Sequence, residues 1–317
     1  VYNSNNDYQS VDPTEINESF LPNTKYLPNY ENGFNPDLKI FDKVNWYESF
    51  RWATRAMVGS NSERTLQGAI IPPKSIHING VLSILFKEES ELLAFSTLMS
   101  SIVLDFYVKV NGWKNIHPNS IKKLPLGKEY LNNYSLGRML RLNCLNKYYA
   151  PLWKRNFNDA FMQDTWSKTD ARLKPFNTLT QEWQWATPLR NWFERRQALV
   201  EIDVITAMAL RLTLDELILI YNVQFPVLQQ NEDDTWYDVT GNIVFTCSKG
   251  LTGVGVDRPV WDTIKGLKAG ETYQHTIEKS ELYYGKKVTY HAPFDKCDRV
   301  EDYKMAWAHF GTIFKES

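Results

Sequence analysis

Basic and polar side chains of the kinds that contact nucleic acid recur between residues 51 and 155 of this 317-residue chain. Arginine can grip a guanine edge or a phosphate with two hydrogen bonds, and lysine neutralises phosphate as a point charge. Phosphate contacts supply affinity and base-edge contacts supply sequence choice. The candidate DNA-contacting residues are Arg51, Arg55, Arg64, Trp113, Lys114, Asn115, His117, Lys122, Lys123, Arg138, Arg141, Lys154 and Arg155.

The polar loop from Trp113 to Ser120 is the centre of this set. It lies between an expected helix and an expected strand, and loops on rigid supports commonly carry recognition. Lys114 and Asn115 are therefore the residues most expected to enter a DNA groove. The alternative is an ordinary exposed turn, which has the same composition.

Arg64, Lys122 and Lys123 could also have structural roles in place of DNA contact. Arg64 could form a buried ion pair with Glu63 or another acid. In a strand over residues 121–127, at most one of Lys122 and Lys123 points inward, and the outward one is the phosphate candidate.

Charge is distributed unevenly along the chain. The net charge of -1 and the pI of about 6.6 argue against a nonspecific nucleic-acid coat but leave specific binding open. Residues 111–196 hold 15 Lys/Arg and 6 Asp/Glu, whereas residues 197–257 hold 2 and 9. The basic block could face phosphate, or its charges could be neutralised nearby in space.

Hydrophobic periodicity predicts an α+β fold. We expect a linker at 1–45, a DNA-binding domain of small sheets and helices at 46–175, and a helical and α+β module at 176–317. Expected helices are 88–110, ending at Asn111-Gly112, then 136–149, 151–161, 180–212 (whole or broken near Pro188), 214–221 with Thr213 and Glu216 as its cap, and 299–314. Expected strands lie at 65–71, within 76–86, and at 121–127, 236–238, 242–247 and 286–291, while 46–57 could be a strand or a short helix.

No group of residues matches a catalytic, cofactor-binding or metal-binding pattern. Cys144, Cys247 and Cys297 are far apart and form no CxxC pair. The histidines lack ligand spacing, and no GxSxG motif is present. The glycine-rich run at 250–255 has the wrong order for a phosphate loop and is expected to be a turn. We therefore expect no catalytic residue, cofactor or metal in this chain.

Several motifs between Arg51 and Gly127 follow one another in a familiar order. They are Arg51-Trp-Ala-Thr-Arg55, Asn61-Ser-Glu-Arg-Thr-Leu-Gln-Gly-Ala-Ile-Ile-Pro-Pro73, Val103-Leu-Asp-Phe-Tyr-Val-Lys109 and Gly112-Trp-Lys-Asn-Ile-His-Pro-Asn-Ser-Ile-Lys-Lys-Leu-Pro-Leu126. In their order and in their residues, these motifs resemble the target-recognition region of type IIG-like and related adenine-specific DNA methyltransferases. The resemblance covers about a quarter of the chain. Gly127 stands where the family often has proline.

The segments at 214–217, 221–228, 235–238, 245–253 and 294–299 resemble the extreme C-terminus of very large bacterial methyltransferases of defence islands, including the DISARM type. The resemblance implies double-stranded DNA as partner and a methyl-transfer domain that binds S-adenosylmethionine upstream of Val1. It also implies other defence-system proteins as partners. The Asn/Asp-Pro-Pro-Tyr/Phe motif of adenine methyl transfer is absent, and Leu27-Pro28-Asn29-Tyr30 has only a slight likeness to it. We expect the acidic module at 214–299 to pack against that catalytic domain or a partner and not to touch DNA.

Other protein classes remain as alternatives. The chain could be a non-catalytic interaction scaffold of a defence complex. Its 11 tryptophans and 14% aromatic content could also suit a carbohydrate-binding module. An intrinsic nuclease is a further alternative, but the sequence offers no PD-(D/E)xK pattern to support it. The polar start without methionine is typical of a piece of a longer protein, and without an apolar leader or span we expect a cytoplasmic protein away from membranes.

Overall fold

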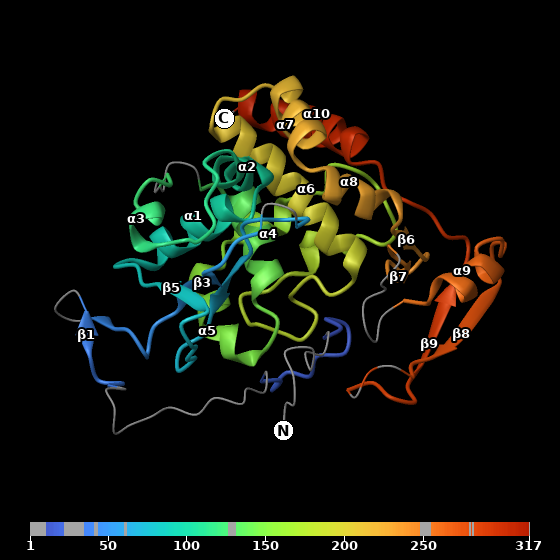
Figure 1. The fold of residues 1–317 in the computed structure, drawn as a ribbon, viewed down its shortest axis with the longest axis horizontal. Coiled ribbons are helices and arrows are strands. Elements are labelled where there is room, and N and C mark those ends of the chain that lie inside the picture. Colours follow the sequence, from blue (N-terminus) through green and yellow to red (C-terminus); the bar gives the residue numbers. More distant parts are fainter. Residues whose placement is uncertain are drawn as a thin grey trace.

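The computed structural model describes residues 11–21, 35–40, 44–59, 62–125, 131–247, 255–278, 280 and 282–316. Much of the expected linker, the end of the expected strand at 126–127 and the glycines at 250–253 lie outside these ranges. The described residues confirm the α+β prediction: they form ten α-helices and small antiparallel sheets, none closed into a barrel (Figure 1).

A three-stranded antiparallel sheet supports the N-terminal half. Its central strand β3 (Arg51–Arg55) lies between β4 (Gly68–Ile71) and β5 (Val81–Ile84). Trp52 on β3 is buried and packs edge to face against Phe95, with 5.0 Å between the ring centroids. A separate hairpin of β1 (Lys39–Ile40) and β2 (Val44–Asn45) precedes the sheet.

The single helix expected over 88–110 is wrong, because the chain breaks into α1 (Glu89–Met99) and α2 (Ile102–Val110), bent by 73°. Ser101 is extended and caps α2 by accepting a hydrogen bond from the Leu104 amide. The expected end is confirmed, since α2 stops before Asn111 and Gly112 has a φ of +64°. No single helix among the described residues is long and apolar enough to span a membrane, and only this bent pair passes that test jointly.

The strand expected at 121–127 is also wrong over its described part. Residues 118–121 form the short helix α3 (Pro118–Ile121), followed by a turn. Proline at the first helical position has a backbone angle already suited to a helix. Buried Ile121 and Leu124 anchor this segment.

Helix α6 (Trp192–Ala209) runs through the centre of the molecule and packs against α4 (Asn133–Asn143) and α10 (Arg299–Glu316) (Figure 1). The expected helix over 180–212 is therefore too long at its start. Asn191 caps α6 through the Glu194 amide, and residues 180–191 form turns around Pro188. The remaining helices of this part are η2 (Lys147–Tyr149), α5 (Ala150–Asn156), η3 (Asp159–Gln163), η4 (Phe176–Thr178), α7 (Leu214–Gln224) and α8 (Pro226–Asp233).

One hydrophobic core extends from Phe50 to Phe310 and contains residues on both sides of position 175. A second, smaller core lies around Trp261 at the right of Figure 1. It is built by β6 (Trp236–Tyr237), β7 (Ile243–Phe245), α9 (Arg258–Ile264), β8 (Thr272–Thr276) and β9 (Lys287–His291).

Candidate nucleic-acid interface

Arg138 lies in the protein interior and is not part of a basic surface. Its Nε donates to Glu201 at 2.5 Å, and its terminal nitrogens pair with Asp164. The guanidinium also stacks over Phe176, 4.8 Å from the ring centroid. Burial acts to lower the pKa of Arg138, but Glu201 and Asp164 raise it overall. The prediction that Arg138 contacts DNA is corrected, because its charge is fully used inside the fold.

The predictions that Arg141 and Arg51 contact DNA are also corrected, because both side chains are buried. Arg141 is buried and donates to the Thr187 carbonyl at 3.2 Å, and burial lowers its pKa to about 10. Arg51 is buried as well, bonds Ser83 and the Ser75 carbonyl, and has its pKa lowered by burial. Neither guanidinium can reach a phosphate in this structure.

Arg64 forms an ion pair inside the fold, which was the alternative to a DNA contact. Its guanidinium lies 3.8 Å from the Asp203 carboxylate and donates to the Ser100 carbonyl at 3.2 Å. Its side chain is only 16% exposed. The acid is therefore a distant one on α6 and not the neighbouring Glu63.

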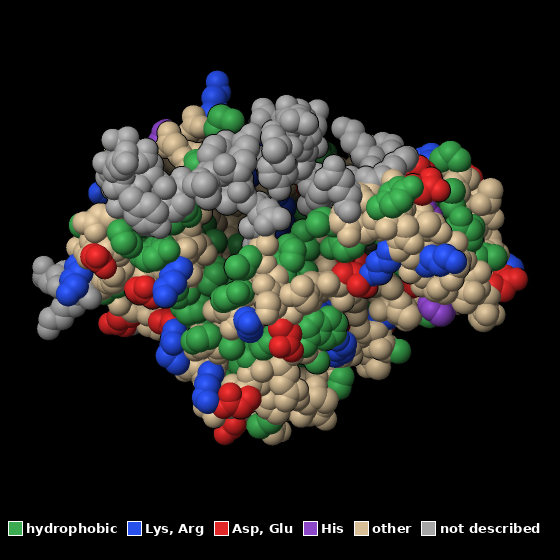
Figure 2. Space-filling model, turned by 90° about the horizontal axis from the view of Figure 1, so that it is seen from below, with side chains coloured by type: hydrophobic (Ala, Val, Ile, Leu, Met, Phe, Trp, Pro, Cys, Tyr) green, Lys and Arg blue, Asp and Glu red, His purple; other side chains and the backbone are tan. Residues whose placement is uncertain are grey.

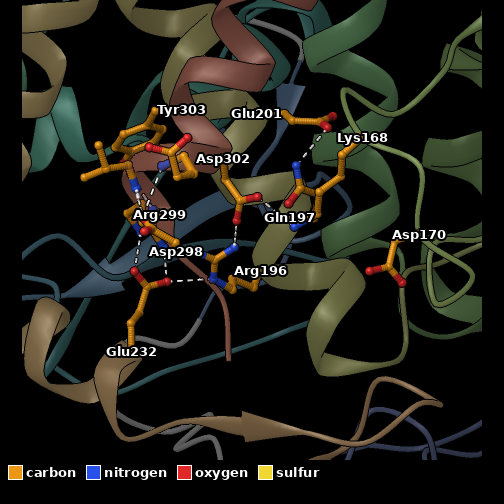
Figure 3. Close-up of polar contacts among 12 residues, drawn as sticks. Lys168, Asp170, Arg196, Gln197, Glu201, Glu232, Asp298, Arg299, Asp302 and Tyr303 are labelled. Carbon is orange, nitrogen blue, oxygen red and sulfur yellow. Dashed lines mark hydrogen bonds and ion pairs between the residues drawn. The ribbon is translucent and has the colours of Figure 1, made fainter. Parts of the chain in front are cut away.

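The internal ion pairs continue through α6, α8 and α10 (Figure 3). Arg196 lies between Glu232, at 2.7 Å, and Asp302, at 2.5 Å. Arg299 contacts the same Glu232 at 2.8 Å and Asp203 at 2.9 Å. Burial acts to raise the pKa of Glu232, but Arg299 and Arg196 lower it to about 2. Within the basic block, Arg138 and Arg196 are thus neutralised in the interior by Glu201 and Glu232 of the acidic block, and no local sequence pattern marked Arg196 or Arg299 for this role.

Lys154 and Arg155 are exposed but already paired. Arg155 binds Glu89 through two hydrogen bonds of 2.6 and 3.1 Å, and Lys154 pairs with Glu182. Among the described residues on the face shown in Figure 2, basic side chains are scattered between acidic, apolar and other ones and form no broad patch of one sign. These two residues are therefore weak candidates for phosphate contact.

The loop before α3 is held rigidly beside the continuation of β3. Asn115 forms an antiparallel bridge with Met57. The Val58 amide donates to the Lys114 carbonyl at 3.0 Å, and the Ile116 amide donates to the Ala56 carbonyl at 2.8 Å. Trp113 is half-buried against Tyr107 and is a support of the loop, with its ring packed inward.

Six of the candidate residues remain exposed around this loop. Buried Ile116 turns its neighbours outward, and both lysines after Ile121 are exposed, where the strand prediction allowed one. Arg55 ends β3 two residues before Met57, whose side chain is 69% exposed. We call this set the basic loop surface; it comprises Arg55, Lys114, Asn115, His117, Lys122 and Lys123.

The basic loop surface offers cations and amide hydrogen bonds but no nucleophile or general base arranged with a partner. Within the described ranges, no three His, Cys, Asp or Glu side chains gather where they could hold a metal ion. Its chemistry is that of anion binding.

No protein-family model matches this chain, and neither curated proteins nor solved structures give a match.

Proposed function

We propose that this chain reads DNA sequence as part of an S-adenosylmethionine-dependent N6-adenine DNA methyltransferase of a restriction-modification or phage-defence system. The methyl-transfer domain and its cofactor then belong to a part of the protein outside this chain. The observation that carries the proposal is the basic loop surface, which projects cations and an amide from a loop bridged to a sheet. The motif resemblance falls on the same segment.

Under this proposal the exposed residues divide into two roles. Lys114, Lys122 and Lys123 neutralise phosphates, which gives affinity without sequence choice. Arg55 and Asn115 contact base edges, since arginine suits guanine and asparagine suits adenine. The bridge at Met57 fixes the loop relative to β3, so that these contacts keep one register.

A non-catalytic scaffold is the second candidate. It is favoured because the side chains of Arg51, Arg64, Arg138 and Arg141 point into the fold, so that fewer cations lie at the surface than the sequence predicted. In that case the chain holds other defence proteins together and binds DNA no better than an average protein does.

Fluorescence anisotropy with a mixed-sequence DNA duplex, titrated across salt, separates the two. Binding should weaken steeply with salt, and replacing Lys114, Lys122 and Lys123 by Gln should reduce the slope of log K against log salt by about 3, near 0.9 for each lost phosphate contact. Lys154→Gln is the matched control, because that lysine already pairs with Glu182. Absence of binding at low salt would reject DNA reading by this chain and leave the scaffold.

A further inference from the structure

A groove runs between strand β5 and helix α3, beside the basic loop surface. Its volume is about 470 Å³, and apolar side chains form most of its wall. Lys87, Glu91 and Lys122 are the charged residues that line it. The apolar wall comprises Leu82, Ile84, Leu85, Phe86, Pro118 and Ile121.

The groove lies along an unpaired strand edge. The Ala56 amide donates to the Gly80 carbonyl at 3.0 Å, so this opposed pair is a hydrogen-bonded one. Bonded pairs recur at every second residue of an antiparallel ladder, and they continue at Leu82 and Ile84. Ser83 therefore points its N–H and C=O away from β3. Within the described residues no partner reaches these two groups.

The opposite edge of the same sheet is closed by side chains. On β4 the outward groups belong to Gly68 and Ile70, and it is at Ile70 that side chains close the edge. The Ile70 amide donates to the Asn143 side chain at 3.0 Å, and its carbonyl accepts from the Tyr149 hydroxyl at 2.8 Å. Proteins commonly protect an edge strand in this way, because open edges recruit other strands. No side chain in the described ranges covers Ser83 of β5 in this way.

We propose that β5 is the docking edge for an extended segment of a partner protein. The segment adds a strand to the sheet by exchanging backbone hydrogen bonds with Ser83, as in other strand-addition complexes. Alternate side chains of an added strand point to the same face as Leu82 and Ile84, so its apolar residues enter the groove. A carboxylate beyond them meets exposed Lys122. This site does not depend on DNA reading.

A second copy of this chain fits the edge less well. In a symmetric pairing of two β5 strands, each copy would have to offer Leu82 or Ile84 to the other's groove. Those side chains are already packed against their own core. A partner segment with free apolar side chains lacks this conflict.

The test uses a fluorescein-labelled peptide of alternating valine and threonine with aspartates at its ends, and a second peptide with serine in place of valine. The valine peptide should bind the wild-type chain and the serine peptide should not. Ser83→Pro removes the outward N–H donor, which an edge strand tolerates, together with the hydroxyl, and should weaken binding about tenfold. Ser83→Ala is the matched control: it keeps the amide, loses the hydroxyl that contacts Arg51 and His77, and should bind within about twofold.

Hydrogen exchange on the unmodified chain gives a readout that does not need a folded variant. The Ser83 amide should exchange at least about tenfold more slowly with the valine peptide present. Failure of the wild type to bind the valine peptide, equal loss in both Ser83 variants, or unchanged exchange at Ser83 would overturn the proposal. Self-association of the chain that Ser83→Pro abolishes would assign the edge to a second copy instead.

Discussion

The Arg138 guanidinium and the Glu201 carboxylate lie 2.5 Å apart between α4 and α6, and neither side chain is exposed to solvent. Asp164 approaches the same guanidinium, so two carboxylates share one buried cation. Arg138, which the sequence predicted to face DNA, thus links helices α4 and α6 inside the core.

Replacing Arg138 by Met should destabilise the fold strongly. The change leaves Glu201 and Asp164 buried without their cation, and breaking a buried pair in this way costs about 3–5 kcal/mol. Urea unfolding followed by far-UV circular dichroism measures the loss. Lys154→Met is the control, because its partner Glu182 is 69% exposed and such surface pairs contribute at most about 1 kcal/mol. Equal losses for the two variants would contradict the assignment.

Stability should fall in acid through Glu232. Burial acts to raise its pKa, but Arg299 and Arg196 lower it to about 2 in the folded chain, against 4.5 for the free side chain. A carboxyl with a lowered folded pKa stabilises the fold above its unfolded pKa and loses this contribution as pH falls from about 5 towards 2. The loss is on the order of 3 kcal/mol. The free energy of unfolding measured across this window should decline less steeply in Glu232→Gln, and parallel curves would exclude the residue as the cause.

Gly68→Ala should disturb the sheet, whereas Gly80→Ala should not. A Cβ at Gly68 would lie 2.1 Å from the buried Trp52 ring, while one at Gly80 meets nothing within 4 Å. Overpacking of this kind costs about 1–3 kcal/mol. At Gly80 alanine should be neutral or should stabilise by up to about 1 kcal/mol. Thermal unfolding of the two variants checks the difference; a tolerant Gly68 would mean that the Trp52 ring can move aside.

Arg55→Ala and Asn115→Ala should relax sequence choice more than they weaken general DNA binding. Loss of a two-bond contact to a base costs about 1–3 kcal/mol of discrimination at that position. Selection from a randomised duplex library, followed by affinity measurement on the selected and a scrambled site, reports the ratio. A uniform drop on both duplexes would place these residues on phosphate and not on bases.

Local features of the fold could be predicted from the sequence. The capping box of Thr213 and Glu216 begins α7 as expected, and Asn111-Gly112 ends α2. These signals work because a cap joins residues a few positions apart, so the chain itself brings the partners together. The exposure of Lys114 and Asn115 followed in the same way from a polar loop.

Whether each arginine side chain points into the core or into solvent was decided by the tertiary structure alone. Arg138 and Glu201 are 63 positions apart, and only the packing of α4 on α6 brings them together. A guanidinium has the same local sequence signature whether it meets a phosphate or a buried carboxylate. The sequence by itself determined that this chain is an α+β protein with a basic segment. Tertiary packing decided which of those charges face solvent, because burial of a charge depends on the carboxylates that distant helices bring to it.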